Sequence, residues 1–210
     1  RAPRAAPFLV VAFAAVVAYL PAFFNGFAWD DEYLVLKNAD IRSLRNVPGI
    51  FARSWAGGVE YELGQAQNRP YFRPMAEASM ALDWALGGGP NPVVFHATNL
   101  ALHVAAALLL LAWLRRLFPG NPEAAGWRRE GLPTLAALLW AVHPVHTEAV
   151  NLITYRTTLL SGLATFAVLA LLGRPWAGTS PETAAQAATG RPLDARRGFL
   201  GVLRRRAASL

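Results

Sequence analysis

Three adjacent carboxylates, Asp30, Asp31 and Glu32, follow closely after an apolar run at residues 7–24. The run contains no charged residue and is about long enough to cross a bilayer as a helix. Acids are poor residues for ending such a helix, because the negative end of the helix dipole favours cations. Carboxylates at a membrane exit are therefore candidates for chemistry on a lipid-borne substrate, with Asp30 and Asp31 as catalytic groups and Glu32 in substrate binding. The alternative is that they only mark the polar end of the span.

Two arginines are candidates for binding a phosphate, because a guanidinium fork matches phosphate oxygens. Arg73 lies in the string RPYFRPM, whose two prolines favour extended or turn backbone. A solvated loop arginine is the alternative there. Arg156 lies near the start of a later apolar run, where an unpaired charge is costly, so we expect it to bind an acid of segment 25–94 or a substrate phosphate.

Histidines form the third group of candidates. His96, Asn99 and His103 share one face of a predicted helix, and that polar face must meet protein or a wet cavity rather than lipid. For His103 a hydrogen bond to a neighbouring helix is the expected role. His96 lies nearer the proposed site and is a candidate for substrate binding. The string HPVHTE places His143, His146 and Glu148 together.

These three side chains could bind substrate, or some of them could bind a metal. Zinc is bound by histidines and carboxylates, so Asp31, Glu148 and His146 are the candidate ligands of a divalent metal. Pro144 weakens that interpretation, because it disrupts the helical spacing of the two histidines. Metal dependence is left open at this point.

Composition places the chain in the membrane class, because 54% of its residues are hydrophobic and only 16% are charged. The net charge of +7 could suggest nucleic acid, but the basic residues are scattered between apolar runs, so no nucleic-acid partner is expected. The absence of cysteine excludes disulfides and thiolate metal sites. Four membrane spans are predicted, at about 7–24, 95–114, 127–143 and 149–172. The third is short, and a re-entrant segment is the alternative.

Arginine placement predicts the topology. If the N-terminus is cytoplasmic, 13 of the 20 basic residues face the cytoplasm, whereas segment 25–94, with eight acids and six bases, lies outside. The first run exceeds a usual signal-peptide core and no small-residue cleavage site follows it, so an uncleaved span is expected. We therefore expect a multi-pass protein of the cell membrane, with its active-site loops on the extracytoplasmic face.

The overall prediction is an all-α polytopic membrane protein with about four transmembrane helices and a helical extracytoplasmic loop. Within that loop, apolar residues between Ile41 and Phe51 recur at helical spacing, although Pro48 and Gly49 interrupt the second half. The segment could be an interfacial helix on the outer leaflet or an ordinary helix packed on its neighbours. Segment 173–210 reads as a cytoplasmic linker that could lead to a further span.

Several separated strings resemble one family, the transmembrane and tetratricopeptide-repeat O-mannosyltransferases and their bacterial relatives. The strings are FNGFAWDDEYLVLKN, YFRPM, ALDWALGGGPNPVVFHATNLALHV and LLWAVHPVHTEAVNLITYRTTLLSGL, in the family's order. The resemblance implies a GT-C glycosyltransferase that uses a polyprenyl-phosphate sugar, with Asp30 or Asp31 acting at the acceptor. Polar motif positions of the family match Arg73, His143, His146, Glu148 and Arg156. Thr157 and Thr158 depart from the small residue and acid that usually follow the matching arginine.

The resemblance also implies that residues 1–172 correspond to the N-terminal membrane portion of a longer enzyme, which could be inactive alone. The expected reaction moves a mannose-like sugar from the polyprenyl-phosphate donor to an acceptor hydroxyl on a protein or glycan. A transporter or channel module, whose polar groups would line a pathway, is one alternative. A non-catalytic membrane anchor for repeat domains is the other.

Overall fold

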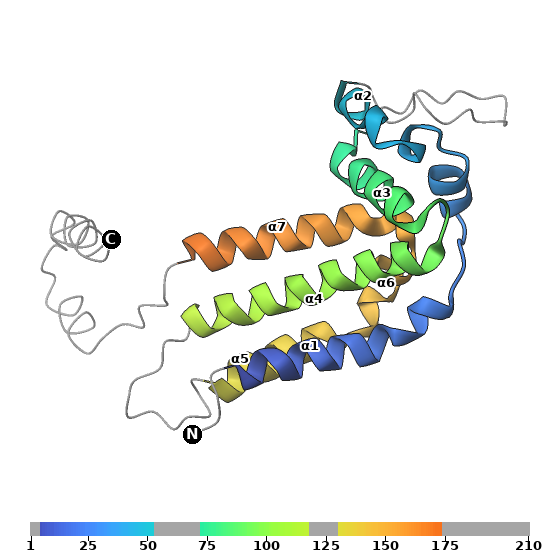
Figure 1. Cartoon of the computed structure of the whole chain (residues 1–210). Helices are drawn as coiled ribbons and strands as arrows, with labels where there is room; N and C mark the ends of the chain where they lie inside the picture. The colour runs from blue at the N-terminus through green and yellow to red at the C-terminus, as the bar shows by residue number, and fades with distance from the viewer. Residues whose placement is uncertain (1–4, 53–71, 118–129, 174–210) are drawn as a thin grey trace, which may run out of the picture. The chain divides into compact units, whose positions relative to one another are not determined.

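The computed structural model describes residues 5–52, 72–117 and 130–173. All of them belong to one compact unit, Arg1–Pro175, and the other unit, Trp176–Leu210, lies outside the described residues. The regular elements in the described ranges are all helical, which confirms the predicted all-α class (Figure 1). The predicted linker 173–210 falls outside the description except for Gly173.

Four apolar helices of the described part form a bundle. They are α1 (Ala6–Tyr19), α4 (Pro92–Leu117), α5 (Leu132–Ala141) and α7 (Arg156–Leu172). Helix α4 lies in the middle and contacts the other three (Figure 1). Small side chains fill the contact between α1, α4 and α5, where Ala15, Ala107, Ala137 and Ala141 are buried beside Val11 and Leu111. Alanine lets helix backbones approach closely, and this is how apolar helices associate when lipid removes the hydrophobic driving force.

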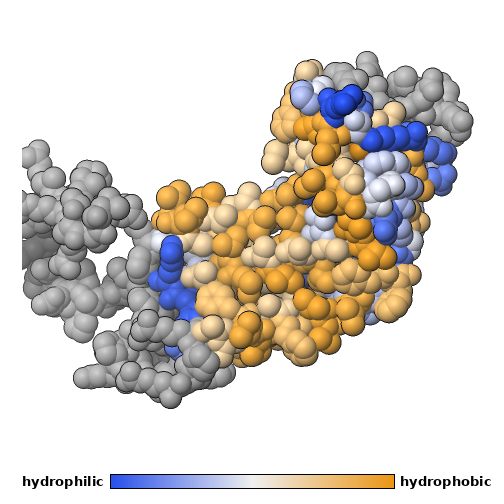
Figure 2. Space-filling view, viewed as in Figure 1, coloured by the Kyte–Doolittle hydropathy of each residue, from blue (hydrophilic) through white to orange (hydrophobic). Residues whose placement is uncertain are grey.

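The outer surface of the bundle is apolar. Large side chains such as Leu9, Phe13, Leu171 and Leu172 are exposed. Figure 2 shows a continuous hydrophobic surface over the helices, with hydrophilic residues gathered toward the two ends. Because an apolar surface of this extent is unfavourable in water, it indicates contact with lipid or with further membrane helices.

Among the described residues, three helices are long and apolar enough to cross a membrane: Ala6–Phe24, Pro92–Leu117 and Ile153–Leu172. The first combines α1 with a 3₁₀ turn, η1 (Leu20–Phe24). Helix α5 has ten residues, or about 15 Å, against a hydrocarbon core of about 30 Å. Where a full span was predicted at 127–143, the described residues contain only this short helix. Residues 127–129 lie outside the description.

The fourth predicted span starts later than residue 149. A short helix, α6 (Thr147–Asn151), ends at Leu152, which is extended, and a 3₁₀ turn, η8 (Ile153–Tyr155), leads into α7. The backbone groups here are bound by distant side chains. Asn99 donates to the carbonyls of Val150 and Leu152. Because tertiary hydrogen bonds replace helical ones, the helix can break at this point without leaving these two backbone carbonyls unpaired.

Segment 25–52 folds into short helical pieces. They are η2, a π-helix at Glu32–Leu36, then η3 (Asp40–Arg42), η4 (Leu44–Asn46) and α2 (Val47–Ala52). Helix α3 (Pro74–Gly87) follows and ends at Gly88, whose φ of 65° is the left-handed conformation that suits glycine. These elements contact α3 and cover the end of the bundle at which α4 and α7 begin, which we call the polar end (Figure 1).

The predicted single helix over residues 41–51 is wrong, because extended Ser43 divides it and caps the next turn through its side chain. Ile41 and Ile50 are buried. Ile41 packs with Met80 and Ala81 of α3. The segment is thus packed on its neighbours, which was the alternative to an interfacial helix. Leu44 and Phe51 remain exposed.

Candidate functional site

The two aspartates predicted as catalytic differ in their surroundings. Asp31 is 0% exposed, and Asp30 is exposed. One Asp31 oxygen accepts a hydrogen bond from the Thr154 amide at 2.9 Å, and the other accepts from the Ala28 amide at 3.2 Å. Asp31 therefore ties the turn that follows η1 to the residues that precede α7, and both of its oxygens are already occupied.

Asp30 lies on a strained turn. The preceding residue, Trp29, has φ of 54° and is 86% exposed. A bulky residue in this left-handed conformation costs on the order of 1–3 kcal/mol, and such strain persists where the surrounding structure imposes it. Here the hydrogen bond between Asp31 and Ala28 closes the turn around Trp29. The turn buries Asp31 and leaves the neighbouring carboxylate of Asp30 at the surface.

Three polar side chains from separate segments lie near Asp30. The hydroxyl of Tyr155 makes a side-chain hydrogen bond with Glu148, and Asp30 and Arg73 lie close enough to act on it electrostatically. Glu148, in α6, is exposed, and Arg73, directly before α3, is half-buried. The structure therefore brings together three predicted site residues, Asp30, Arg73 and Glu148, around a tyrosine that sequence reasoning missed.

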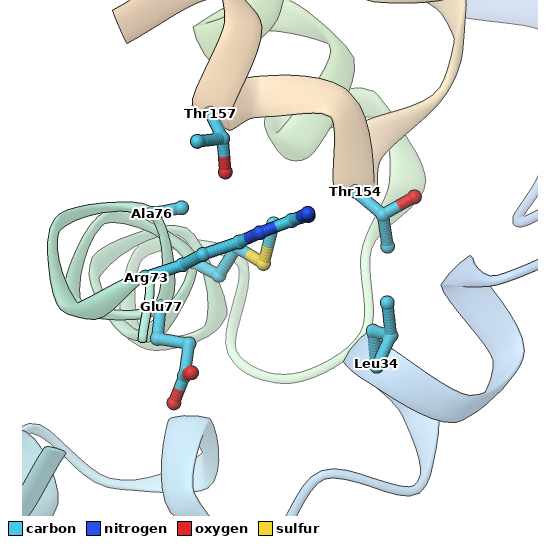
Figure 3. A pocket seen from close by; sticks show the side chains of 7 residues that line it. Leu34, Arg73, Ala76, Glu77, Thr154 and Thr157 are labelled. Atoms are coloured by element: carbon cyan, nitrogen blue, oxygen red, sulfur yellow. The ribbon is translucent and has the colours of Figure 1, made fainter. Parts of the chain in front are cut away.

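Arg73 also lines a small pocket beneath this surface (Figure 3). The other lining residues are Leu34, Ala76, Glu77, Met80, Thr154 and Thr157. The side chain of Arg73 crosses the pocket, and the hydroxyl of Thr157 turns toward it (Figure 3). That buried hydroxyl has no hydrogen-bond partner among the described residues. The pocket therefore presents a cation, an unused hydroxyl and the buried carboxylate of Glu77.

Arg156 is fully buried in a network of polar groups. Its Nη1 lies 2.6 Å from Oδ2 of Asp83, which is 1% exposed. Its Nε donates to Asn99 at 2.8 Å, its Nη2 to the carbonyl of Phe95 at 3.0 Å, and its Nη1 also to Ser79 at 3.3 Å. The expectation that Arg156 pairs with an acid of segment 25–94 is confirmed, and Asp83 is that acid.

Asp83 is held on its other side by Thr98, whose hydroxyl donates to Oδ1 at 2.7 Å. Burial raises the pKa of the Asp83 carboxyl, whereas Arg156 and Thr98 pull it back down. Asp83, Ser79 and Thr98 were not predicted as site residues. The available signal was an acid in the otherwise apolar string SMALDWAL, since a carboxylate among buried apolar residues needs a partner.

Two histidines of α4 are buried, at the positions that the polar stripe predicted. His103 Nε2 lies 2.8 Å from the Ala141 carbonyl of α5, so the predicted hydrogen bond to a neighbouring helix is confirmed. His96 is fully buried at the polar end, close enough to Asp31 for an electrostatic interaction. It does not reach the surface at which Asp30 lies exposed.

His143 and His146 lie in the turn between α5 and α6. The Tyr19 hydroxyl donates to the His143 carbonyl at 2.6 Å, and His143 Nδ1 accepts from the Val145 amide. The ring of His146 lies against Trp140, with centroids 4.3 Å apart, and near His103 at 5.1 Å. These contacts join the turn to α1 and α4, and His146 is part of an aromatic cluster.

The remaining predicted groups do not assemble into a metal centre. Within the described ranges, no three histidine or carboxylate side chains are grouped as metal ligands. The candidate ligand set of Asp31, Glu148 and His146 is therefore not assembled, since Asp31 binds two backbone amides and His146 packs among rings. Glu32 instead pairs with Lys37 at 3.3 Å on η2.

Comparison with known proteins gives several similar sequences that are named protein O-mannosyl-transferases. Human protein O-mannosyl-transferase TMTC4 is 31% identical over 169 residues, which cover 79% of this chain and 22% of TMTC4. Human TMTC1 is 32% identical over 157 residues, covering 73% of this chain and 16% of TMTC1. Drosophila melanogaster Tmtc1 is 32% identical over 147 residues, covering 70% and 16%.

The chain thus spans about a fifth or less of the length of these curated relatives. No family model matches it, and no solved structure matches it. The similarity extends over most of the chain and recurs in relatives named TMTC1, Tmtc2, TMTC3 and TMTC4. Together with the apolar helices, it makes this chain a membrane-protein relative of the protein O-mannosyl-transferases TMTC1 to TMTC4.

Proposed function

We propose that this chain forms part of a GT-C type glycosyltransferase that moves a mannose-like sugar from a polyprenyl-phosphate donor to a protein hydroxyl at the extracytoplasmic membrane face. The observation that carries the proposal is the identity of about 30% to named O-mannosyl-transferases over 79% of the chain. The polar end supports it, because an exposed carboxylate, an arginine and a tyrosine gather where the apolar helices end. That level suits a substrate whose lipid tail stays in the bilayer.

In this mechanism Asp30 is the general base. The acceptor hydroxyl loses its proton to the Asp30 carboxylate while its oxygen attacks the anomeric carbon, and the bond to the polyprenyl phosphate breaks. Asp30 suits this role because it is exposed, whereas both oxygens of Asp31 accept backbone hydrogen bonds. Asp31 holds the turn in place and is a positioning residue.

The leaving phosphate needs a cation, and the two candidate arginines differ in what surrounds them. The guanidinium of Arg156 is buried and bound by Asp83, Asn99, Ser79 and the carbonyl of Phe95. Arg73 lines a pocket close to the group that includes Asp30. We therefore assign charge stabilisation in the transition state to Arg73. The acceptor hydroxyl would approach between Asp30 and the pair formed by Tyr155 and Glu148.

The test measures mannose transfer by the intact protein in membranes, with a polyprenyl-phosphate mannose donor and a protein acceptor. Asp30→Asn keeps the side-chain shape and removes the base, so the rate should fall by about 100- to 10,000-fold. Glu130→Gln alters an exposed carboxylate that pairs with Arg115 near the C-terminal end of α4, far from Asp30. This variant should leave the rate near that of the parent. A parental rate in Asp30→Asn would exclude the assignment of Asp30, and no transfer by the parent protein would exclude the reaction.

A further inference from the structure

A buried ion pair lies behind the candidate site and is not used by the proposed reaction. Asp83 of α3 and Arg156 of α7 are 2.6 Å apart, and both side chains are removed from water. A buried pair is weak evidence for stability, because desolvation costs about as much as the attraction returns. The presence of this pair in an apolar bundle therefore calls for a role in fixing a particular geometry.

The hydrogen bonds and the ion pair of Arg156 join three helices, α3, α4 and α7. Arg156 is the first residue of α7, and it binds Ser79 and Asp83 of α3 together with Asn99 and the Phe95 carbonyl of α4. The pair therefore fixes the start of α7 relative to α3 and α4 through bonds with defined directions.

The residues directly before Arg156 carry the candidate site. The amide of Thr154 holds Asp31, and the hydroxyl of Tyr155 contacts Glu148. Any shift of the first turn of α7 moves both contacts. Asp31 closes the turn that carries Asp30. A displacement of Arg156 would therefore move Thr154, then Asp31 through its hydrogen bond to the Thr154 amide, and with it the exposed carboxylate of Asp30.

We infer that Asp83 and Arg156 are positioning residues for the site at Asp30, and that neither binds the donor phosphate. The pair acts through Thr154 and Asp31, so its loss should lower the catalytic rate and leave donor binding intact. This inference rests on the proposed function only in its kinetic part, since the local order of residues 28–34 and 150–157 can be measured without turnover.

The kinetic test compares Asp83→Asn with the parent protein in membranes. A small misplacement of reacting groups costs about 100-fold, so kcat should fall by about that factor while the donor KM changes less than about threefold. Thr98→Val, which removes one hydrogen bond to Asp83 and nearly keeps the volume, should lower kcat by a smaller factor with the same KM. A donor KM that rises tenfold with kcat unchanged in either variant would overturn the inference.

A double variant separates positioning from phosphate binding. In Asp83→Leu, Arg156 is left unpaired, whereas Asp83→Leu with Arg156→Met replaces the whole pair by apolar side chains of similar size, an exchange that buried pairs often tolerate. The double variant should regain at least tenfold in kcat over Asp83→Leu. If Arg156 binds phosphate, the double variant stays as slow as Asp83→Leu, and the inference is wrong.

Amide hydrogen exchange gives the readout that is independent of sugar transfer. In Asp83→Asn, amides in residues 28–34 and 150–157 should exchange at least tenfold faster than in the parent, with the amides of α1 unchanged. Glu130→Gln, which breaks an exposed ion pair, should change neither region. Unchanged exchange at Thr154 in Asp83→Asn would contradict the inference even if the parent protein transfers no sugar.

Discussion

Two ion pairs stand near opposite ends of α4 and have different surroundings. At the polar end, Arg156 and Asp83 are 2.6 Å apart with side chains 0% and 1% exposed. Near the C-terminal end of α4, Arg115 and Glu130 are 3.6 Å apart with side chains 21% and 47% exposed. Asn99, which binds Arg156, and Arg115 are separated by about 24 Å along α4.

The difference shows how one interaction type can have two roles in a membrane protein. The exposed pair is screened by water and can exchange partners at little cost. Arg115 and the neighbouring Arg116 are among the basic residues from which the topology was predicted. The buried pair cannot exchange partners, because its charges have no access to water. It therefore fixes a geometry, and the candidate site is built on that geometry.

The largest effect is expected from a test of sidedness. Cysteines at Ala28 and Glu130 occupy exposed positions at the two ends, and the native chain has no cysteine. If the arginine-rich end is cytoplasmic, a membrane-impermeant maleimide added outside intact cells should label Ala28→Cys and leave Glu130→Cys unlabelled until the membrane is opened. Labelling of both from one side would place the two ion pairs on the same face and end the comparison.

The next largest effect is a difference in stability, because breaking the buried ion pair should lower the free energy of unfolding more than breaking the exposed one. Arg156→Leu leaves Asp83 as a buried charge without its partner and should lower the free energy of unfolding by about 3–5 kcal/mol. Glu130→Gln should lower it by less than about 1 kcal/mol. Denaturant unfolding in detergent micelles measures both values. Equal losses in the two variants would mean that burial does not distinguish the pairs.

A smaller loss in the free energy of unfolding is expected from a variant at His103, which lies in the middle of the bundle between the two ion pairs. His103→Phe keeps a ring of similar size next to Trp140 but removes the donor to the Ala141 carbonyl. A buried carbonyl left without its partner costs about 1–3 kcal/mol in the free energy of unfolding. Sugar transfer per folded molecule should stay near the parental value, since His103 lies deeper in the bundle than Asp30. A selective loss of transfer would extend the site along α4.

The smallest expected effect is a loss of folding stability at acidic pH that depends on His146. Burial, followed by the neighbouring rings of His103 and His143, lowers the pKa of His146. Its ordinary pKa is about 6.5, so below that pH the unfolded chain binds more protons than the folded one. Stability from this group is therefore complete above about pH 6.5 and is lost as the pH falls toward the lower folded pKa.

Thermal unfolding in micelles at pH 7.5 and 5.5 tests this sign. The parent protein should unfold at a lower temperature at pH 5.5, and His146→Phe, which keeps the ring against Trp140 without a titrating group, should lose less. An equal fall in the two proteins would assign the acid sensitivity to other groups.

The sequence alone was enough to predict the all-α membrane class of the protein and the burial or pairing of several polar side chains. Apolar runs of spanning length must become helices in a bilayer, because only helices satisfy every backbone group within one segment. The stripe of His96, Asn99 and His103 was predicted from helical spacing, and all three are buried. A buried arginine needs a partner wherever it lies, so the prediction for Arg156 was an acid of segment 25–94 or a substrate phosphate, and the structure shows an acid.

The tertiary structure decided which polar groups are buried and which partners they bind, and the spacing of residues in the sequence does not determine either. Asp30 and Asp31 are equivalent in sequence, and only the hydrogen bonds from Ala28 and Thr154 bury one and leave the other exposed. The choice of Asp83 as the partner of Arg156 depends on how α3 crosses the starts of α4 and α7, because the two residues are 73 positions apart in the chain. The break before α7 likewise exists because Asn99 and Asp31 bind backbone groups there. Local sequence fixes which groups must find partners, and the packing of distant segments decides which partners they find.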